Sequence, residues 1–83
     1  NYHLLIVIDP TDHAQVARAK QLSAQVVDTA LKLGGTCTGE HGIGVGKKDY
    51  LKVEHATAIN MMKSIKMALD PKNIMNPGKI FDL

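Results

Sequence analysis

The chain has 83 residues, of which 45% are hydrophobic and 22% charged, and this composition is ordinary for a folded soluble domain. A net charge of +2, scattered lysines and a 4% aromatic content give no case for a nucleic-acid partner. No apolar run approaches the roughly 18 residues of a membrane span, so no transmembrane segment is predicted. The chain lacks an initiating Met and opens on a strand-like run, which indicates a fragment of a larger protein.

The first predicted element is a strand over residues 2–8. This short apolar run is rich in β-branched residues and is bounded by Asp9-Pro10, where proline prevents the ladder from continuing. Side chains alternate between the faces of a strand, so Leu5 and Val7 lie on one face, opposite Ile6. Because both faces are apolar, we expect both to be covered.

A long amphipathic helix is predicted over residues 13–33, where apolar side chains recur at spacings of three and four. Thr11 or Asp12 is its N-cap, and Gln15 stands where the capping-box partner of Asp12 belongs. Gly34-Gly35 supplies the C-cap. The apolar stripe consists of Val16, Ala19, Leu22, Val26, Ala30 and Leu33.

Two further helices are predicted in the second half of the chain. A short helical piece covers residues 47–53, and a firmer helix covers residues 54–69 and ends at Asp70-Pro71. In the tail, residues 74–81, a Pro-Gly turn is followed by Ile80-Phe81. A free tail would rarely carry two such large apolar residues, so we expect them to pack against another part of the protein.

The stretch Gly35–Lys48 lies between the predicted helices and carries glycines at positions 35, 39, 42, 44 and 46. Glycine at this density weakens regular structure and favours a shaped loop. A P-loop is excluded, because His41 stands where its first glycine belongs and Lys48 where its Ser or Thr belongs. The Gly-x-Gly-x-x-Gly spacing of dinucleotide sites is absent as well, so phosphate binding by this loop is not predicted.

Glu40 and His41 place a carboxylate and an imidazole side by side in this loop. Neighbouring loop residues point in different directions, so one of them can act as a metal ligand and the other as a base. His3 could join Glu40 on zinc or manganese, although two ligands are too few for a site. The alternative is that His3 is a hydrogen-bonded edge histidine and Glu40-His41 an ordinary solvated turn. Cys37 is interpreted as a small packing residue rather than a nucleophile.

Three motifs together resemble the C-terminal end of the FAD-linked oxidases of the vanillyl-alcohol-oxidase type. They are Thr38–Gly44, Leu69-Asp70-Pro71 and Met75–Ile80. Within that family the resemblance is to the branch of cytochrome-type D-lactate dehydrogenase and glycolate oxidase, with D-2-hydroxyglutarate dehydrogenase nearby. It implies an α+β fold in which residues 1–83 are an incomplete piece of the ferredoxin-like cap, or substrate, domain. That piece would contain one strand, a long helix, the glycine-rich loop and C-terminal helices.

The resemblance also implies roles for three residues. His3 corresponds to the second histidine of the family's metal-binding pair, Glu40 to the carboxylate ligand of that metal, and His41 to the base that takes the substrate's hydroxyl proton. The implied cofactors are FAD, bound mostly by a domain absent from this chain, and a divalent metal, zinc or manganese. No residue of this chain is assigned to FAD. The implied reaction is oxidation of a small D-2-hydroxy acid, D-lactate or glycolate, to the 2-oxo acid.

The resemblance further implies an N-terminal FAD-binding domain as partner. It also implies a location in the cytoplasm or at the inner membrane periphery, or in mitochondria for a eukaryote. The rival hypothesis is an autonomous, non-catalytic α+β module for interaction or regulation. Since one strand cannot cover the apolar faces of both long helices, we expect the chain alone to self-associate into a homo-oligomer or to be partly molten. We also expect it to lack flavin and activity.

Overall fold

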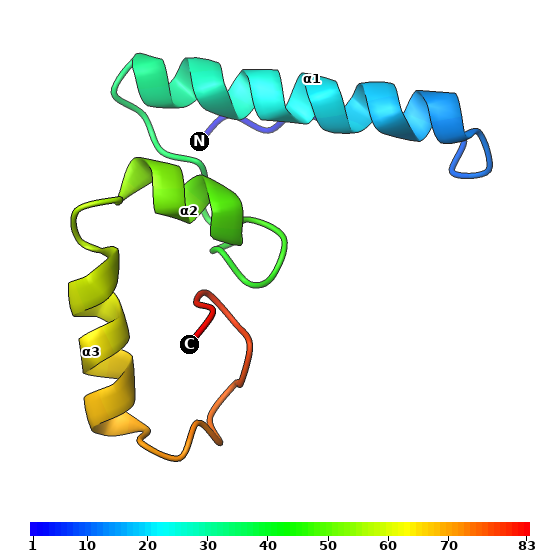
Figure 1. Cartoon of the computed structure of the whole chain (residues 1–83). Coiled ribbons are helices and arrows are strands. Elements are labelled where there is room, and N and C mark those ends of the chain that lie inside the picture. The colour runs from blue at the N-terminus through cyan, green and yellow to red at the C-terminus, as the bar shows by residue number, and fades with distance from the viewer. The chain divides into compact units, whose positions relative to one another are not determined.

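The computed structural model describes all residues, 1–83, and contains three helices (Figure 1). They are α1 (His13–Lys32), α2 (Lys48–Glu54) and α3 (Ile59–Leu69). The chain divides into two compact units, Asn1–Glu40 and His41–Leu83. The first unit holds α1, and the second holds α2 and α3. None of the helices combines the length and the hydrophobicity needed to cross a membrane.

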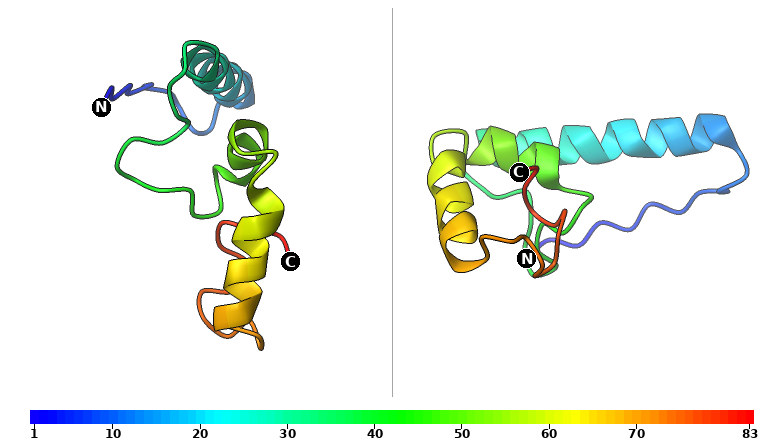
Figure 2. Two further views of the ribbon diagram at one scale, coloured as in Figure 1. Left: turned by 90° about the vertical axis from the view of Figure 1, so that its left-hand side faces the viewer. Right: turned by 60° about the horizontal axis from the view of Figure 1, so that its bottom comes forward.

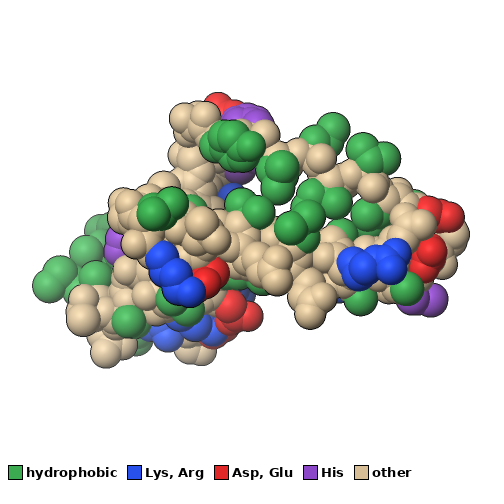
Figure 3. All heavy atoms as spheres, turned by 90° about the horizontal axis from the view of Figure 1, so that it is seen from above, with side chains coloured by type: hydrophobic (Ala, Val, Ile, Leu, Met, Phe, Trp, Pro, Cys, Tyr) green, Lys and Arg blue, Asp and Glu red, His purple; other side chains and the backbone are tan.

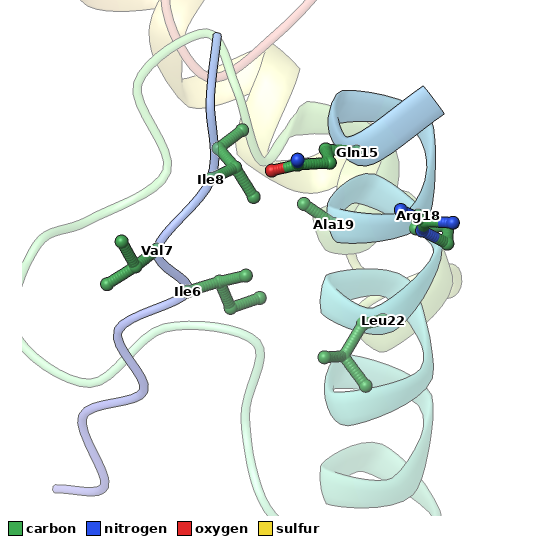
Figure 4. Close-up of a pocket in the computed structure, with 7 residues that line it drawn as sticks. All are labelled: Ile6, Val7, Ile8, Gln15, Arg18, Ala19 and Leu22. Atoms are coloured by element: carbon green, nitrogen blue, oxygen red, sulfur yellow. The ribbon is translucent and has the colours of Figure 1, made fainter. Parts of the chain in front are cut away.

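The strand predicted over residues 2–8 is not formed, so the structure shows the helices of the expected α+β fold but not its one strand. A strand exists only when its backbone groups pair with a neighbouring segment, and here the run lies beside the helix α1 instead (Figure 2). The predicted alternation of side chains is nevertheless present. Ile6 and Ile8 point toward α1 and are half-buried, whereas Val7 points away and is 86% exposed (Figure 4).

Helix α1 begins where the sequence predicts, with Asp12 as its N-cap. The Asp12 carboxylate accepts hydrogen bonds from the backbone N–H groups of Ala14 and Gln15, which the helix itself leaves unpaired. The Gln15 side chain departs from the capping-box pattern, because its amide oxygen accepts from the Asp9 N–H rather than from that of Asp12. Gln15 therefore ties the helix to the Asp9 turn as well as to its cap.

The predicted glycine C-cap of α1 is confirmed and has the form of a Schellman motif. The Gly34 N–H donates to the Leu31 carbonyl at 3.1 Å, and the Gly35 N–H donates to the Ala30 carbonyl at 2.7 Å. Gly34 has a φ of 80°, a conformation that costs glycine nothing but strains other residues. The chain leaves the helix here in a new direction and becomes the glycine-rich loop.

The second unit confirms the short helix predicted over residues 47–53, which is α2, but corrects the start of the helix predicted over 54–69. Glu54 is the last residue of α2, and residues 55–58 form a turn in which the N–H groups of Ala58 and Ile59 both bond to the His55 carbonyl. Helix α3 thus begins five residues later than predicted. The reason is that His55, with φ and ψ of -121° and 37°, lies outside the helical region.

Helix α3 ends at Asp70, as predicted, and the Asp70 side chain organises the turn that follows. Its carboxylate accepts from the backbone N–H groups of Ile74 at 3.0 Å and Met75 at 2.9 Å, and it pairs with Lys66 one helical turn earlier. The Lys66 ammonium also donates to the Met75 carbonyl at 2.6 Å. Asp70 is only 6% exposed, so these contacts replace the water that a buried carboxylate loses.

The chain after α3 turns back toward α2 and the loop before it (Figure 1). Phe81 is half-buried, in line with the prediction that the tail packs, but the Ile80 side chain stays 41% exposed. Ile80 makes its contact through the backbone, since its N–H donates to the Gly44 carbonyl at 2.7 Å. The tail is therefore anchored mainly by hydrogen bonds.

Few apolar side chains are buried in either unit. Cys37 and Leu51 are each 6% exposed, whereas many large hydrophobic side chains face solvent (Figure 3). The stripe predicted on α1 is only half-buried along much of its length, and its end residue Leu33 is 82% exposed. These exposures agree with the expectation that the helices need more apolar cover. Self-association itself stays a prediction.

The N-cap of α1 is expected to contribute measurably to its helicity. In a peptide of residues 9–35, Asp12→Ala should destabilise the helix by about 0.5–2 kcal/mol, because two backbone N–H groups lose their acceptor. Circular dichroism would show this as a weaker helical signal. Asp12→Asn is the matched control, since asparagine is an equally good cap and should preserve helicity. Equal signals for all three peptides would contradict the capping role.

The Asp70 contacts are expected to weaken in acid. The hydrogen bond from Lys66, helped by those from Ile74 and Met75 against the cost of burial, lowers the pKa of Asp70 below that of an ordinary aspartate. A lowered folded-state pKa means that the stabilisation is complete above the pKa of an unfolded aspartate and is lost as the pH falls through the lower folded value. Hydrogen-exchange protection factors of the Ile74 and Met75 amides should show this loss.

Asp70→Asn should lower the same two protection factors at neutral pH and make them insensitive to acid, because no carboxylate remains to titrate. Asp28→Asn is the control, since Asp28 pairs with Lys32 on the exposed surface of α1 in the other unit. Protection that is unchanged by acid in the unsubstituted chain would contradict the assigned role of Asp70.

Candidate functional site

Two of the predicted site residues, His3 and Glu40, lie at the two ends of the first unit and meet there. The imidazole Nε2 of His3 lies 2.8 Å from the carboxylate Oε1 of Glu40. Both side chains are more than half exposed, at 62% and 54%, so a ligand from solvent has access to both. The sequence suggested that these residues share a site, and the geometry supplies the contact between them.

Two local features of the glycine-rich loop allow this contact. The Schellman motif at Gly34-Gly35 redirects the chain after α1, and the following residues then reach the N-terminal segment. Gly39 lies against Asn1, where an added Cβ would come within 2.5 Å of the Asn1 side-chain oxygen. A larger residue at position 39 would have to displace Asn1, two residues from His3.

His41 follows Glu40 directly along the chain and is the first residue of the second unit. It is exposed, and it stands before two glycines with positive φ, Gly42 at 77° and Gly44 at 53°. The loop is shaped further along by a hydrogen bond from the Lys47 N–H to the Ile43 carbonyl at 3.2 Å. His41 is thus carried by a backbone whose conformation depends on glycine.

One further sequence prediction for this region is supported by the structure, and one set of contacts was not predicted. Cys37 is buried, as expected of a packing residue. The ion pairs of Asp82 with Lys48 at 2.9 Å and Lys52 at 3.1 Å had no signal in the sequence, because the partners lie 34 and 30 residues apart. These contacts fix the tail beside the loop.

The donor atoms of His3 and Glu40 suit a divalent metal in type and nearly in spacing. Zinc binds imidazole nitrogen and carboxylate oxygen at about 2.0–2.2 Å, which places two ligands of a tetrahedral ion about 3.3 Å apart. The observed separation of 2.8 Å would have to widen by about half an ångström, a shift that two exposed side chains can make. A complete site would need further ligands besides these two.

Comparison with known proteins identifies the family. Residues 1–80 match the family described as FAD linked oxidases, C-terminal domain. A probable mitochondrial D-lactate dehydrogenase of Danio rerio is 49% identical over 84 residues, which cover 100% of this chain and 17% of that protein. The mitochondrial cytochrome-type D-lactate dehydrogenase of Arabidopsis thaliana is 48% identical over 81 residues, which cover 96% of this chain and 14% of that protein.

A bacterial relative extends the comparison beyond D-lactate dehydrogenases. The glycolate oxidase subunit GlcD of Bacillus subtilis is 42% identical over 82 residues, which cover 98% of this chain and 17% of that protein. The chain therefore spans only 14–17% of the length of these three relatives. With a family match over nearly all its residues and relatives of 42–49% identity, the chain belongs to the C-terminal domain of the FAD linked oxidases, a family of enzymes.

Proposed function

We propose that this chain supplies metal-binding and acid–base residues to a flavoenzyme that oxidises a D-2-hydroxy acid to the 2-oxo acid. The observation that carries the proposal is the His3–Glu40 contact of 2.8 Å, followed directly in sequence by His41, in a chain of this family. The relatives are named for D-lactate, glycolate and, at 47% identity over 57 residues, D-2-hydroxyglutarate. These three acids share a hydroxyl on the carbon next to the carboxylate, and we favour D-lactate or glycolate as the substrate.

Oxidation of a 2-hydroxy acid removes a hydride from C2 and a proton from the hydroxyl oxygen. The hydride acceptor would be supplied by FAD bound to the rest of the protein. His41 accepts the hydroxyl proton, because an imidazole titrates near neutral pH and a positioned base of that kind is effective at physiological pH. The 2-oxo acid is formed as the C2–O bond becomes a carbonyl, and the proton leaves His41 to solvent, to which this residue is exposed.

His3 and Glu40 are the residues of this chain that would hold a divalent metal, zinc or manganese. Such an ion, when bound, polarises the oxygens of the substrate and makes its hydroxyl more acidic. Their exposure is what this role requires, since the ligands must face the substrate rather than the interior. Glu40 and His41 then perform different tasks from adjacent positions, one as a ligand and one as a base.

The proposal includes a partner and a location. The remaining 83–86% of the length of the three relatives has no counterpart in this chain, and we assign to it an N-terminal FAD-binding domain. The two eukaryotic relatives are named as mitochondrial, so a eukaryotic source would place this protein in mitochondria. A bacterial source would place it in the cytoplasm or at the inner membrane periphery.

The roles of Glu40 and His41 can be separated in the complete flavoprotein. His41→Ala should leave metal and FAD contents near normal but slow flavin reduction by substrate by roughly 10²–10⁴-fold, the usual worth of a positioned general base. Glu40→Ala should lower metal content together with activity, because the site loses a ligand. Anaerobic stopped-flow absorbance and elemental analysis measure the two effects.

His13→Ala is the matched control for His41→Ala. His13 is an exposed histidine at the first position of α1, and its replacement should leave both flavin reduction and metal content unchanged. Normal flavin reduction in His41→Ala would remove His41 as the base. Normal metal content in Glu40→Ala would remove Glu40 as a ligand.

A further inference from the structure

We propose that the segment Lys79–Asp82, termed the tail clamp, holds the glycine-rich loop in the conformation that positions His41, and that Asp82 is therefore a positioning residue. The inference rests on the proposed function, in which His41 takes the substrate's proton. All the contacts that support this inference lie within the second unit, His41–Leu83.

The first contact joins the clamp to the middle of the loop. The Ile80 N–H donates to the Gly44 carbonyl at 2.7 Å, three residues after His41. Ile80 has a φ of 65°, and a tight turn closes around it through a hydrogen bond from the Phe81 N–H to the Lys79 carbonyl at 2.7 Å. A β-branched residue rarely adopts positive φ, and such strain persists only where surrounding contacts hold it.

The second contact joins the clamp to the helix that follows the loop. One carboxylate oxygen of Asp82 lies 2.9 Å from Lys48 Nζ and the other lies 3.1 Å from Lys52 Nζ. These lysines are four residues apart and so lie on one face of α2. The Lys48 side chain is only 15% exposed, but the Asp82 side chain is 60% exposed, so we give this ion pair the strength of a surface pair. Lys48 first, and then Lys52, lowers the pKa of Asp82, so the carboxylate stays ionised.

The two contacts matter because the loop has little stiffness of its own. Residues 42, 44 and 46 are glycines, which leave the backbone after His41 with wide conformational freedom. A general base must lie within about 2.6–3.2 Å of the oxygen that carries the proton, so even a small displacement of the loop lowers the rate. The clamp restricts the loop near its middle, through Gly44, and at its end, through α2 (Figures 1 and 2).

The chain offers a matched pair of variants that isolates the clamp. Asp82→Asn breaks the ion pairs that reach the tail, whereas Asp49→Asn removes the other carboxylate on Lys52, at 3.2 Å, and leaves the tail bound. Each variant removes one negative charge that pairs with a lysine of α2, and only the Asp82 charge links that helix to the tail. Asp82→Glu keeps the charge and should restore much of the behaviour lost in Asp82→Asn.

The experiment uses the complete flavoprotein and two readouts. Hydrogen–deuterium exchange at the loop amide of Lys47, which bonds to the Ile43 carbonyl, should be about threefold faster or more in Asp82→Asn and unchanged in Asp49→Asn. Ion pairs of this kind contribute up to about fivefold in an equilibrium. Stopped-flow flavin reduction should slow by about three- to tenfold in Asp82→Asn, with normal FAD content and little change in substrate KM.

A second pair of variants tests the backbone contact. Ile80→Gly and Ile80→Pro both remove the isoleucine side chain, but only glycine keeps the N–H and accepts positive φ. Loop exchange should stay near normal in Ile80→Gly and rise in Ile80→Pro.

Unchanged loop exchange in Asp82→Asn would overturn the clamp, and so would equal exchange in Asp82→Asn and Asp49→Asn. Faster loop exchange with unchanged flavin reduction would overturn its positioning role. Failure of the proposed function gives a different result. Normal flavin reduction in His41→Ala would remove His41 as the base, and the hydrogen-exchange data would still decide whether the tail clamp holds the loop.

Discussion

The requirement that helix ends find partners for their unpaired backbone groups shapes the first unit of this chain, and a buried aspartate shapes the second. Asp12 meets the requirement at the start of α1, the Schellman motif meets it at the end of α1, and the turn held by Asp70 follows directly on the end of α3. In a chain with so few buried apolar side chains, these polar contacts determine where each connecting segment goes. The residues to which we assign functional roles, His3, Glu40 and His41, lie on those segments rather than on the helices.

This arrangement explains how a loop rich in glycine can still carry a site. The segment after α1 is directed back to the N-terminal run, which lets Glu40 reach His3, and the segment after α3 is directed back to the loop, which lets Ile80 reach Gly44. Membership in an enzyme family weighs against the autonomous, non-catalytic module that the sequence also allowed. Under the proposed mechanism, glycine supplies the unusual conformations around His41 and neighbouring segments supply the restraint.

Features that depend on neighbouring residues, such as helix caps and helix ends, could be predicted from the sequence. Contacts between residues far apart in the chain could not. Asp12 and Gly34 follow from capping rules, and the end of α3 follows from the restriction that Pro71 places on the residue before it. Even the Lys66–Asp70 pair has the four-residue spacing at which side chains on a helix meet. The prediction of a strand over residues 2–8 failed because a strand depends on pairing with another segment. The alternation of side chains depends only on the extended run itself, and it was predicted correctly. The missed Asp82 pairs had no local signal. His3 and Glu40 were linked by their chemistry and by family resemblance, and only the folded structure could give their contact.

The contact between His3 and Glu40 joins positions 3 and 40, and so closes nearly the whole first unit into a ring. Closing a loop of this length has an entropic cost that rises only slowly with further length, and an exposed polar contact offsets little of that cost by itself. An ion shared by the two side chains would be a reversible counterpart of a disulfide, in a chain whose single cysteine cannot form one internally. Occupancy of the site and integrity of the unit that builds it would then rise and fall together.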